Sequence, residues 1–148
     1  MSEIRFYHLE RQTLDQVLPM LLAKALEGGR RAVVKARDAR EVQRLNDHLW
    51  AYSPDSFLPH GSEKEGQAEN QPVWITTEDE KPNGADVLIL TDGTNSEMLD
   101  QFALCCDVFD GSNEAALSQA RARWKAYKDT EHELTYWQQG QGGWEKKA

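Results

Sequence analysis

The residues best suited to chemistry lie in a basic run near the end of the chain. Residues 115–128 contain no acid, in a protein with a formal net charge of −8, and carry four cations, namely Arg121, Arg123, Lys125 and Lys128. In a helix, Arg121, Lys125 and Lys128 would line one stripe, and Trp124 would lie beside it. A cationic stripe next to a large aromatic ring is suited to a ligand that is anionic and has an apolar end.

An acidic peptide that ends in a hydrophobic residue has both properties. The alternative interpretation is a solvated helix face with Trp124 turned into the core, because charged helix faces commonly carry no function. This segment alone leaves both interpretations open.

The composition limits the class of protein. At 148 residues, with 39% hydrophobic and 28% charged side chains, the chain is typical of one globular domain. It has no apolar run of about 18 residues that would span a membrane, and its start does not resemble a signal peptide. The only cysteines, Cys105 and Cys106, are adjacent, which favours a reducing cytoplasm. A net charge of −8 argues against direct binding of DNA over a broad surface, so we expect DNA contact only through a partner.

Strand and helix patterns alternate along the chain. Strands are predicted at 4–9, 32–36, 73–76, 85–90 and 103–109, with a brief one at Phe57-Leu58. Helices are predicted from Thr13 to Gly28, from Asp38 to about Trp50, briefly near 96–102, and over the basic run after Ser112 or Asn113. This order indicates an α/β fold of three layers with a mostly parallel sheet. We expect one domain over 1–137, a loop over 61–71 and a flexible C-terminal tail over 138–148.

The usual signatures of an enzyme are missing. The turn after the first strand, His8 to Thr13, has no glycine and contains an acid, which argues against a nucleotide site, and no P-loop lysine is present. The histidines do not have metal-ligand spacing, Cys105-Cys106 is not a CxxC pair, and no Gly-x-Ser-x-Gly occurs. We therefore predict no catalytic residue, no metal and no cofactor, although an α/β enzyme with an unfamiliar site stays an alternative.

Two segments together carry a resemblance to a known family. Leu49-Trp50 is followed by Ser56-Phe57-Leu58-Pro59-His60, and the basic run reads Ala-Arg-Ala-Arg-Trp-Lys-Ala-Tyr-Lys over 120–128. With the Phe-Tyr of the first strand, and in this order, they resemble the chi subunit of the bacterial DNA polymerase III holoenzyme. The resemblance extends from about Ile4 to Lys128.

The resemblance implies a non-catalytic accessory protein of the clamp-loader assembly, with a mononucleotide-binding-like fold that holds no nucleotide. It implies that the basic helix binds the acidic C-terminal tail of the single-stranded-DNA-binding protein, through Arg121, Trp124 and Lys125. Phe109 matches an apolar position of that site, and Lys128 extends the cationic stripe. Leu117 stands where the family can carry a basic residue, so one charge of the site is missing.

A second surface is implied at the end of the second predicted helix. Trp50 and Phe57 match family positions that dock the psi subunit and can dock a helicase. Ordinary core packing is the alternative for both side chains, since aromatic residues at helix ends are commonly buried. A general binding module for acidic peptides, unrelated to replication, is a further alternative for the chain as a whole.

Overall fold

One mostly parallel sheet organises the protein, as the alternating pattern predicts. The computed structural model describes residues 2–51, 60–140 and 143–148. Its eight strands lie in the order β3-β4-β2-β5-β6-β1-β7-β8. Neighbouring strands pair in parallel except β7 and β8, which are antiparallel. The strands are β1 (Glu3–Leu9), β2 (Ala32–Lys35), β3 (Gly61–Ser62), β4 (Val73–Thr76), β5 (Val87–Thr91), β6 (Leu104–Asp110), β7 (Glu133–Gly140) and β8 (Gly143–Lys146).

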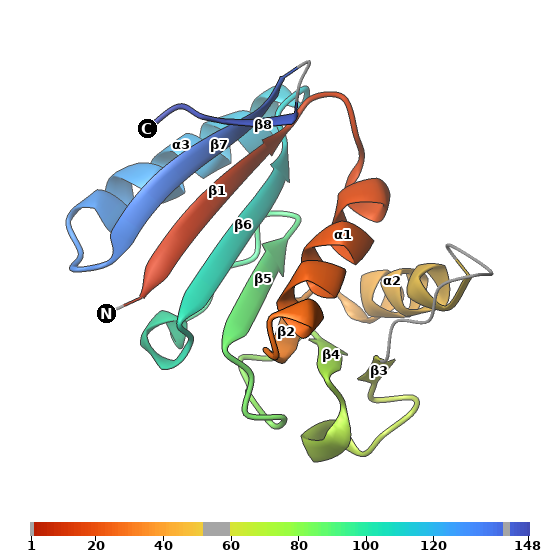
Figure 1. Cartoon of the computed structure of the whole chain (residues 1–148). Coiled ribbons are helices and arrows are strands. Elements are labelled where there is room, and N and C mark those ends of the chain that lie inside the picture. The colour runs from red at the N-terminus through yellow and green to blue at the C-terminus, as the bar shows by residue number, and fades with distance from the viewer. Residues whose placement is uncertain (1, 52–59, 141–142) are drawn as a thin grey trace.

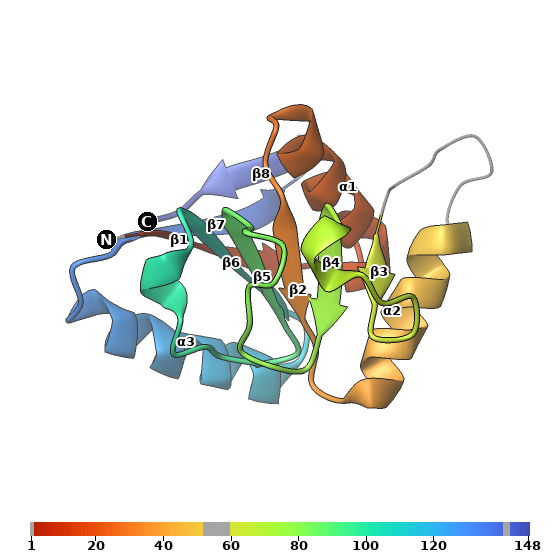
Figure 2. The same cartoon turned by 90° about the horizontal axis from the view of Figure 1, so that it is seen from below.

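Helices cover both faces of the sheet and complete the three layers. Helices α1 (Leu14–Glu27) and α2 (Ala39–Ala51) pack on one face, and α3 (Glu114–Lys128) packs on the other (Figures 1 and 2). Two short 3-10 turns, η1 (Ala68–Asn70) and η2 (Leu99–Gln101), lie in connections. No helix in the described ranges is long and apolar enough to cross a membrane.

Local sequence sets where the helices begin. Thr13 and Gln16 form a capping box at the start of α1, and the backbone N–H of Thr13 donates to Gln16 Oε1 at 2.9 Å. Asp38 Oδ1 accepts the N–H of Glu41 at 2.8 Å before α2. Asn113 Oδ1 accepts the N–H of Ala116 at 2.9 Å, so the basic helix begins where the sequence predicts.

Some boundaries differ from the prediction. The strand predicted over 85–90 begins at Val87, and the helix predicted near 96–102 is the single 3-10 turn η2. The predicted loop over 61–71 contains β3, which is only two residues long, and η1. Elements this short carry too few side chains for a hydrophobic period to show. The strand predicted at Phe57-Leu58 lies outside the described residues.

The alternation of each strand divides the core into two clusters. On β1, Tyr7 and Leu9 face α1 and α2, whereas Ile4 and Phe6 face α3. Cys105 and Cys106 follow the same rule on β6 and are both buried, as small apolar residues would be. Burial raises the pKa of each cysteine thiol to about 12, so both stay protonated and unreactive at neutral pH.

A buried ion pair fixes the basic helix to the sheet. The Arg123 guanidinium donates to both carboxylate oxygens of Asp107 on β6, at 2.7 and 2.9 Å. The Asp107 side chain is 1% exposed and that of Arg123 13% exposed. Burial raises the pKa of Asp107, and the hydrogen bonds and charge of Arg123 oppose that shift. Of the four cations in the basic run, Arg123 therefore points inward.

The C-terminal segment, expected as a flexible tail, contains strand structure that the sequence pattern does not predict. Residues 138–140 continue β7, and 143–146 form β8, which pairs with it. Trp144 packs edge-on against Tyr7, with ring centroids 5.0 Å apart. The Gln139 side chain is buried under the loop after β1. A Gln- and Gly-rich segment has no periodic apolar pattern from which a strand could be predicted. Its strands form against distant parts of the chain, through Trp144 on Tyr7 and Gln139 on the loop after β1.

The ion pair predicts a large difference between neighbouring arginines. Arg123→Ala should lower the free energy of unfolding by about 3–5 kcal/mol, because it leaves the Asp107 carboxylate buried without a partner. Arg121→Ala, which removes an exposed arginine two residues away, should change stability by about 0.5 kcal/mol or less. Urea unfolding followed by circular dichroism measures both. Equal stabilities of the two variants would show that the pair does not anchor α3.

Candidate functional site: a basic, aromatic pocket beside α3

The exposed cations of α3 form the predicted stripe. Arg121, Lys125 and Lys128 are all exposed. Within the part of the chain that the structure describes, none of the three forms an ion pair or a side-chain hydrogen bond. Because Arg123 is turned toward the sheet, the opposite side of the helix, which carries the stripe, must face solvent. The three charges are therefore available to an anionic partner.

Trp124 lies at the border between this stripe and the core. Its ring packs edge-on against Phe6 of β1 and Tyr136 of β7, with centroids 5.4 and 5.6 Å away. The side chain is partly buried, so it joins the core without being enclosed by it. One edge joins the aromatic cluster under α3, and the rest is open to the surface.

Beside Trp124 the surface is hollowed into a pocket of about 430 Å³. Three elements line it: α3 through Arg121 and Trp124, β1 through His8, and the β7–β8 hairpin through Tyr136, Gln138 and Ala148. We call this cavity the α3 pocket. One wall supplies a guanidinium that can bind two carboxylate oxygens, and aromatic rings supply the apolar lining.

The other predicted residues lie around the α3 pocket. Phe109 is buried behind it and does not line it, with its ring 6.1 Å from that of Tyr136. Lys125 and Lys128 continue the stripe beyond the pocket lining. Three lining residues were not predicted from the sequence, namely His8, Tyr136 and Gln138. His8 could have been found, because strand alternation puts it on the same face of β1 as Phe6. Tyr136 and Gln138 could not, because no local pattern shows that β7 pairs with β1.

His8 and Tyr136 form a hydrogen-bonded pair in the α3 pocket. The Nδ1 atom of His8 lies 2.7 Å from the Tyr136 hydroxyl. Burial lowers the pKa of His8; the Glu10 carboxylate opposes this and the Arg121 charge adds to it. Burial also raises the pKa of Tyr136. At neutral pH both groups are therefore uncharged, and Arg121 is the cation of the pocket.

Gly111 makes room for the His8 ring. A Cβ atom on Gly111 would lie 1.9 Å from both Cδ2 and Nε2 of the imidazole, which no side chain tolerates. The backbone N–H of Gly111 donates to the Leu9 carbonyl at 2.8 Å, so the turn after β6 is held against the end of β1. Glycine at this position is thus required by close approach to the ring.

The second predicted surface is only partly described. Trp50, near the end of α2, is 47% exposed, and its ring centroid lies 4.3 Å from that of His60. Trp50 is therefore outside the core. Phe57 lies outside the described residues. Figure 1 places the end of α2 and the basic helix α3 on opposite sides of the sheet.

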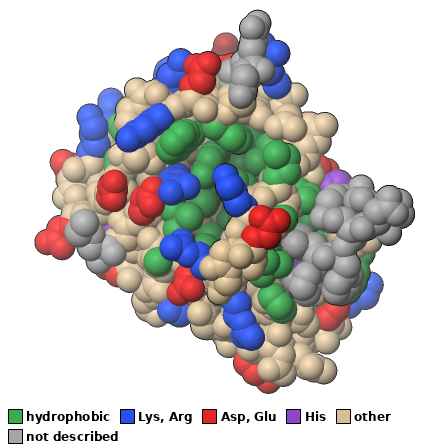
Figure 3. All heavy atoms as spheres, in the orientation of Figure 1, with side chains coloured by type: hydrophobic (Ala, Val, Ile, Leu, Met, Phe, Trp, Pro, Cys, Tyr) green, Lys and Arg blue, Asp and Glu red, His purple; other side chains and the backbone are tan. Residues whose placement is uncertain are grey.

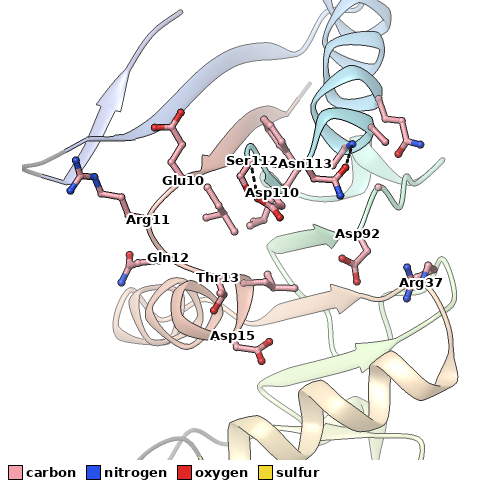
Figure 4. A pocket seen from close by; sticks show the side chains of 18 of the residues that line it. Glu10, Arg11, Gln12, Thr13, Asp15, Arg37, Asp92, Asp110, Ser112 and Asn113 are labelled. Carbon is pink, nitrogen blue, oxygen red and sulfur yellow. Dashed lines mark hydrogen bonds between the residues drawn. The ribbon is translucent and has the colours of Figure 1, made fainter.

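A larger crevice of about 640 Å³ lies at the carboxyl ends of β1 and β6. Here the chain leaves β1 toward α1 on one face and leaves β6 toward α3 on the other, which is where α/β folds commonly bind nucleotides. Acidic and basic side chains line the crevice in equal number, and most of them are labelled in Figure 4. The acids are Glu10, Asp15, Asp92 and Asp110, and the bases are Arg11, Arg37, Arg44 and Arg123. Arg44 is bound to Asp15 at 2.6 Å and Arg123 to Asp107.

The backbone donors of this crevice are already used. Gln139 Oε1 accepts the N–H groups of Glu10, Arg11 and Gln12, at 2.8, 3.0 and 3.1 Å. These are the amides of the loop that would hold a phosphate in a nucleotide-binding relative of the fold. The loop is therefore stabilised from inside the protein by a side chain of β7. No cluster of metal-binding side chains occurs among the described residues either.

These features define a class: an α/β domain of mononucleotide-binding type whose open, charged pocket lies beside a helix on its flank. Comparison with known proteins gives the family. Residues 1–135 match the family model described as DNA polymerase III chi subunit, HolC. The chain therefore belongs to the DNA polymerase III chi subunit family, a family of replication accessory subunits.

Two curated relatives agree with this assignment. A probable DNA polymerase III subunit chi from Rickettsia prowazekii is 32% identical over 95 residues, which cover 64% of this chain and 58% of that protein. The DNA polymerase III subunit chi of Escherichia coli is 26% identical over 136 residues, covering 86% of this chain and 92% of its own length. The match to the Rickettsia protein thus spans just over half of that relative.

The fit of His8 against Gly111 can be tested by substitution. Gly111→Ala should destabilise the protein by about 1–3 kcal/mol, because the ring or the turn must move to admit a methyl group. Gly28→Ala is the matched control, since a Cβ there meets only ordinary contacts at 3.5 and 3.6 Å. Thermal unfolding compares the two. The double variant His8→Ala/Gly111→Ala should recover part of the loss that the Gly111 change causes, and strictly additive effects would contradict the contact.

Proposed function

We propose that this protein is a non-catalytic adaptor that binds the acidic C-terminal tail of a single-stranded-DNA-binding protein in the α3 pocket. In this proposal it links that tail to the polymerase III clamp-loader assembly in the cytoplasm and reaches DNA only through the partner. The observation that carries the proposal is the shared lining of one open cavity by Arg121 and Trp124. Family membership supports a replication partner over an arbitrary one.

The chemistry of the α3 pocket matches such a tail. The terminal carboxylate would pair with Arg121, whose planar fork binds two oxygens at once. The terminal phenylalanine ring would contact Trp124 and Tyr136 and approach Phe109 behind them. Aspartates farther up the peptide would lie along Lys125 and Lys128. A site this small predicts an affinity on the order of micromolar, which several tails on one oligomer would strengthen.

A second partner would use the surface around Trp50 and Phe57. The exposure of Trp50 supports a contact role over core packing. We propose that this surface docks the holoenzyme-side subunit psi, or a helicase, while the α3 pocket holds the tail. Because the end of α2, which carries Trp50, and the basic helix α3 lie on different sides of the sheet (Figure 1), both partners could be bound together.

The tail site predicts an order among the cations. Arg121→Ala should weaken binding of a fluorescent acidic tail peptide at least tenfold, because it removes a bidentate carboxylate contact. Lys125→Ala should weaken binding less, since an ammonium is a single point charge. Arg40→Ala, an exposed arginine on α2, is the charge-matched control and should bind as the wild type does. Fluorescence anisotropy measures all three, and wild-type affinity of Arg121→Ala would refute the site.

The same titration separates the alternatives. A peptide amidated at its C-terminus, or one with the phenylalanine moved inward, should bind much more weakly than the natural arrangement. Equal binding of all acidic peptides would instead indicate a general acidic-peptide module. A thermal shift with a nucleotide, and none with the peptide, would favour an enzyme that uses the crevice at the strand ends.

The two aromatic surfaces should separate by substitution. Trp50→Ala should leave tail binding within about twofold and reduce capture of the second partner, because its ring is exposed away from α3. Trp124→Ala should weaken tail binding and leave capture of the second partner unchanged. Melting curves must accompany this variant, since loss of a partly buried ring can lower the free energy of unfolding by about 3 kcal/mol or more. Pull-downs with the tail peptide and with psi provide the measurement. A folded Trp50→Ala protein that has lost tail binding would show that the two surfaces are one.

A further inference from the structure

The β7–β8 hairpin forms the wall of the α3 pocket opposite the basic helix. Three of the lining residues, Tyr136, Gln138 and Ala148, come from this segment. All three lie beyond the residues that match the family model, which end at 135. The family match therefore accounts for the α3 side of the pocket and leaves this wall unexplained.

Strand register decides which side chains of the hairpin face the pocket. Gln138 pairs with Glu145, and Trp137 pairs with Lys146. Beyond β8 the pairing is irregular: the N–H of Lys147 donates to the Tyr136 carbonyl at 2.7 Å, whereas the N–H of Tyr136 donates to the Ala148 carbonyl at 3.2 Å. Lys147 and Ala148 therefore stand together opposite Tyr136, as in a β-bulge. Because side chains directly opposite each other share a face, Glu145 lies on the α3 face with Gln138, and the ion pair of Lys147 with Glu145 brings the Lys147 ammonium to that face.

The neighbouring residues point the other way. Trp144 packs on Tyr7, which belongs to the core on the α1 side of the sheet. Strand alternation places Lys146 on that same side, away from α3. Two adjacent lysines of one segment thus lie on opposite faces. Lys147 does not line the α3 pocket itself, but it directly precedes the lining residue Ala148.

Lys147 adds a charge on the side of the pocket where the lining has no cation, since the lining residues of this segment are Tyr136, Gln138 and Ala148. Among the described residues Lys147 forms an ion pair with Glu145 alone, at 3.0 Å, and both side chains are about half exposed (48% and 56%). An ion pair this exposed contributes little, so a ligand carboxylate can replace Glu145 at small cost.

We propose that Lys147 is a further ligand-binding residue of the α3 pocket. It pairs with an aspartate carboxylate of a bound acidic peptide from the hairpin side, while Arg121 holds the terminal carboxylate from α3. This inference rests on the proposed function and deepens it: the site takes a peptide with at least two separated carboxylates, gripped between two walls.

The adjacent lysines provide a matched test. The probe is the fluorescent acidic tail peptide, titrated at several salt concentrations against Lys147→Gln and Lys146→Gln. Lys147→Gln should weaken binding about three- to fivefold, the effect of one exposed charge pair, and should flatten the salt dependence. Lys146→Gln has the same change in net charge and should stay within about twofold. Lys147→Arg should retain binding, and Glu145→Gln should strengthen it by releasing Lys147.

Each outcome bears on a different claim. Equal losses in the two lysine variants would overturn the inference, because they would reflect net charge and not position. Wild-type binding by Lys147→Gln would overturn it as well. Failure of the unsubstituted protein to bind the peptide would overturn the proposed function and this inference together. Unchanged melting temperatures of the variants show that the hairpin is intact.

Discussion

The buried ion pair between Asp107 and Arg123 is the constraint on which the binding surface depends. A carboxylate that is 1% exposed must be paired, and the arginine that binds it, Arg123, lies in the middle of α3. This contact fixes the rotation of the helix about its axis. The exposed stripe of Arg121, Lys125 and Lys128 then follows from helical geometry, and so does the half-buried position of Trp124.

The aromatic cluster under α3 connects that helix to the sheet at the same place. Phe6 lies at its centre and contacts rings from β6, α3 and β7, namely Phe109, Trp124, Tyr127 and Tyr136. Two of these rings, Trp124 and Tyr136, line the α3 pocket, and Arg121 is the cation of its lining. The lining is therefore divided between aromatic surface and positive charge. Such a division suits a peptide that has one anchoring ring and several carboxylates.

The crevice at the strand ends and the flank of α3 differ in how their polar groups are paired. At the carboxyl ends of β1 and β6, Gln139 engages the loop amides, and the charges of the crevice balance. On the flank, the exposed cations Arg121, Lys125 and Lys128 have no internal partners among the described residues, whereas Arg123 is paired with Asp107. In a protein of net charge −8, this stripe is a region of unpaired positive charge.

The sequence by itself determined the α/β class, the order of the main elements and the basic stripe, because helix caps, strand runs and charge spacing are local signals. Tertiary structure alone decided that Arg123 points inward and that Gln139 fills the loop after β1. It also decided that His8 of β1, Tyr136 and Gln138 of β7, and Ala148 complete the pocket. Each of these depends on strands far apart in the chain becoming neighbours, β7 beside β1 above all. Long-range pairing of this kind is set by the whole sheet, and no local pattern of residues encodes it.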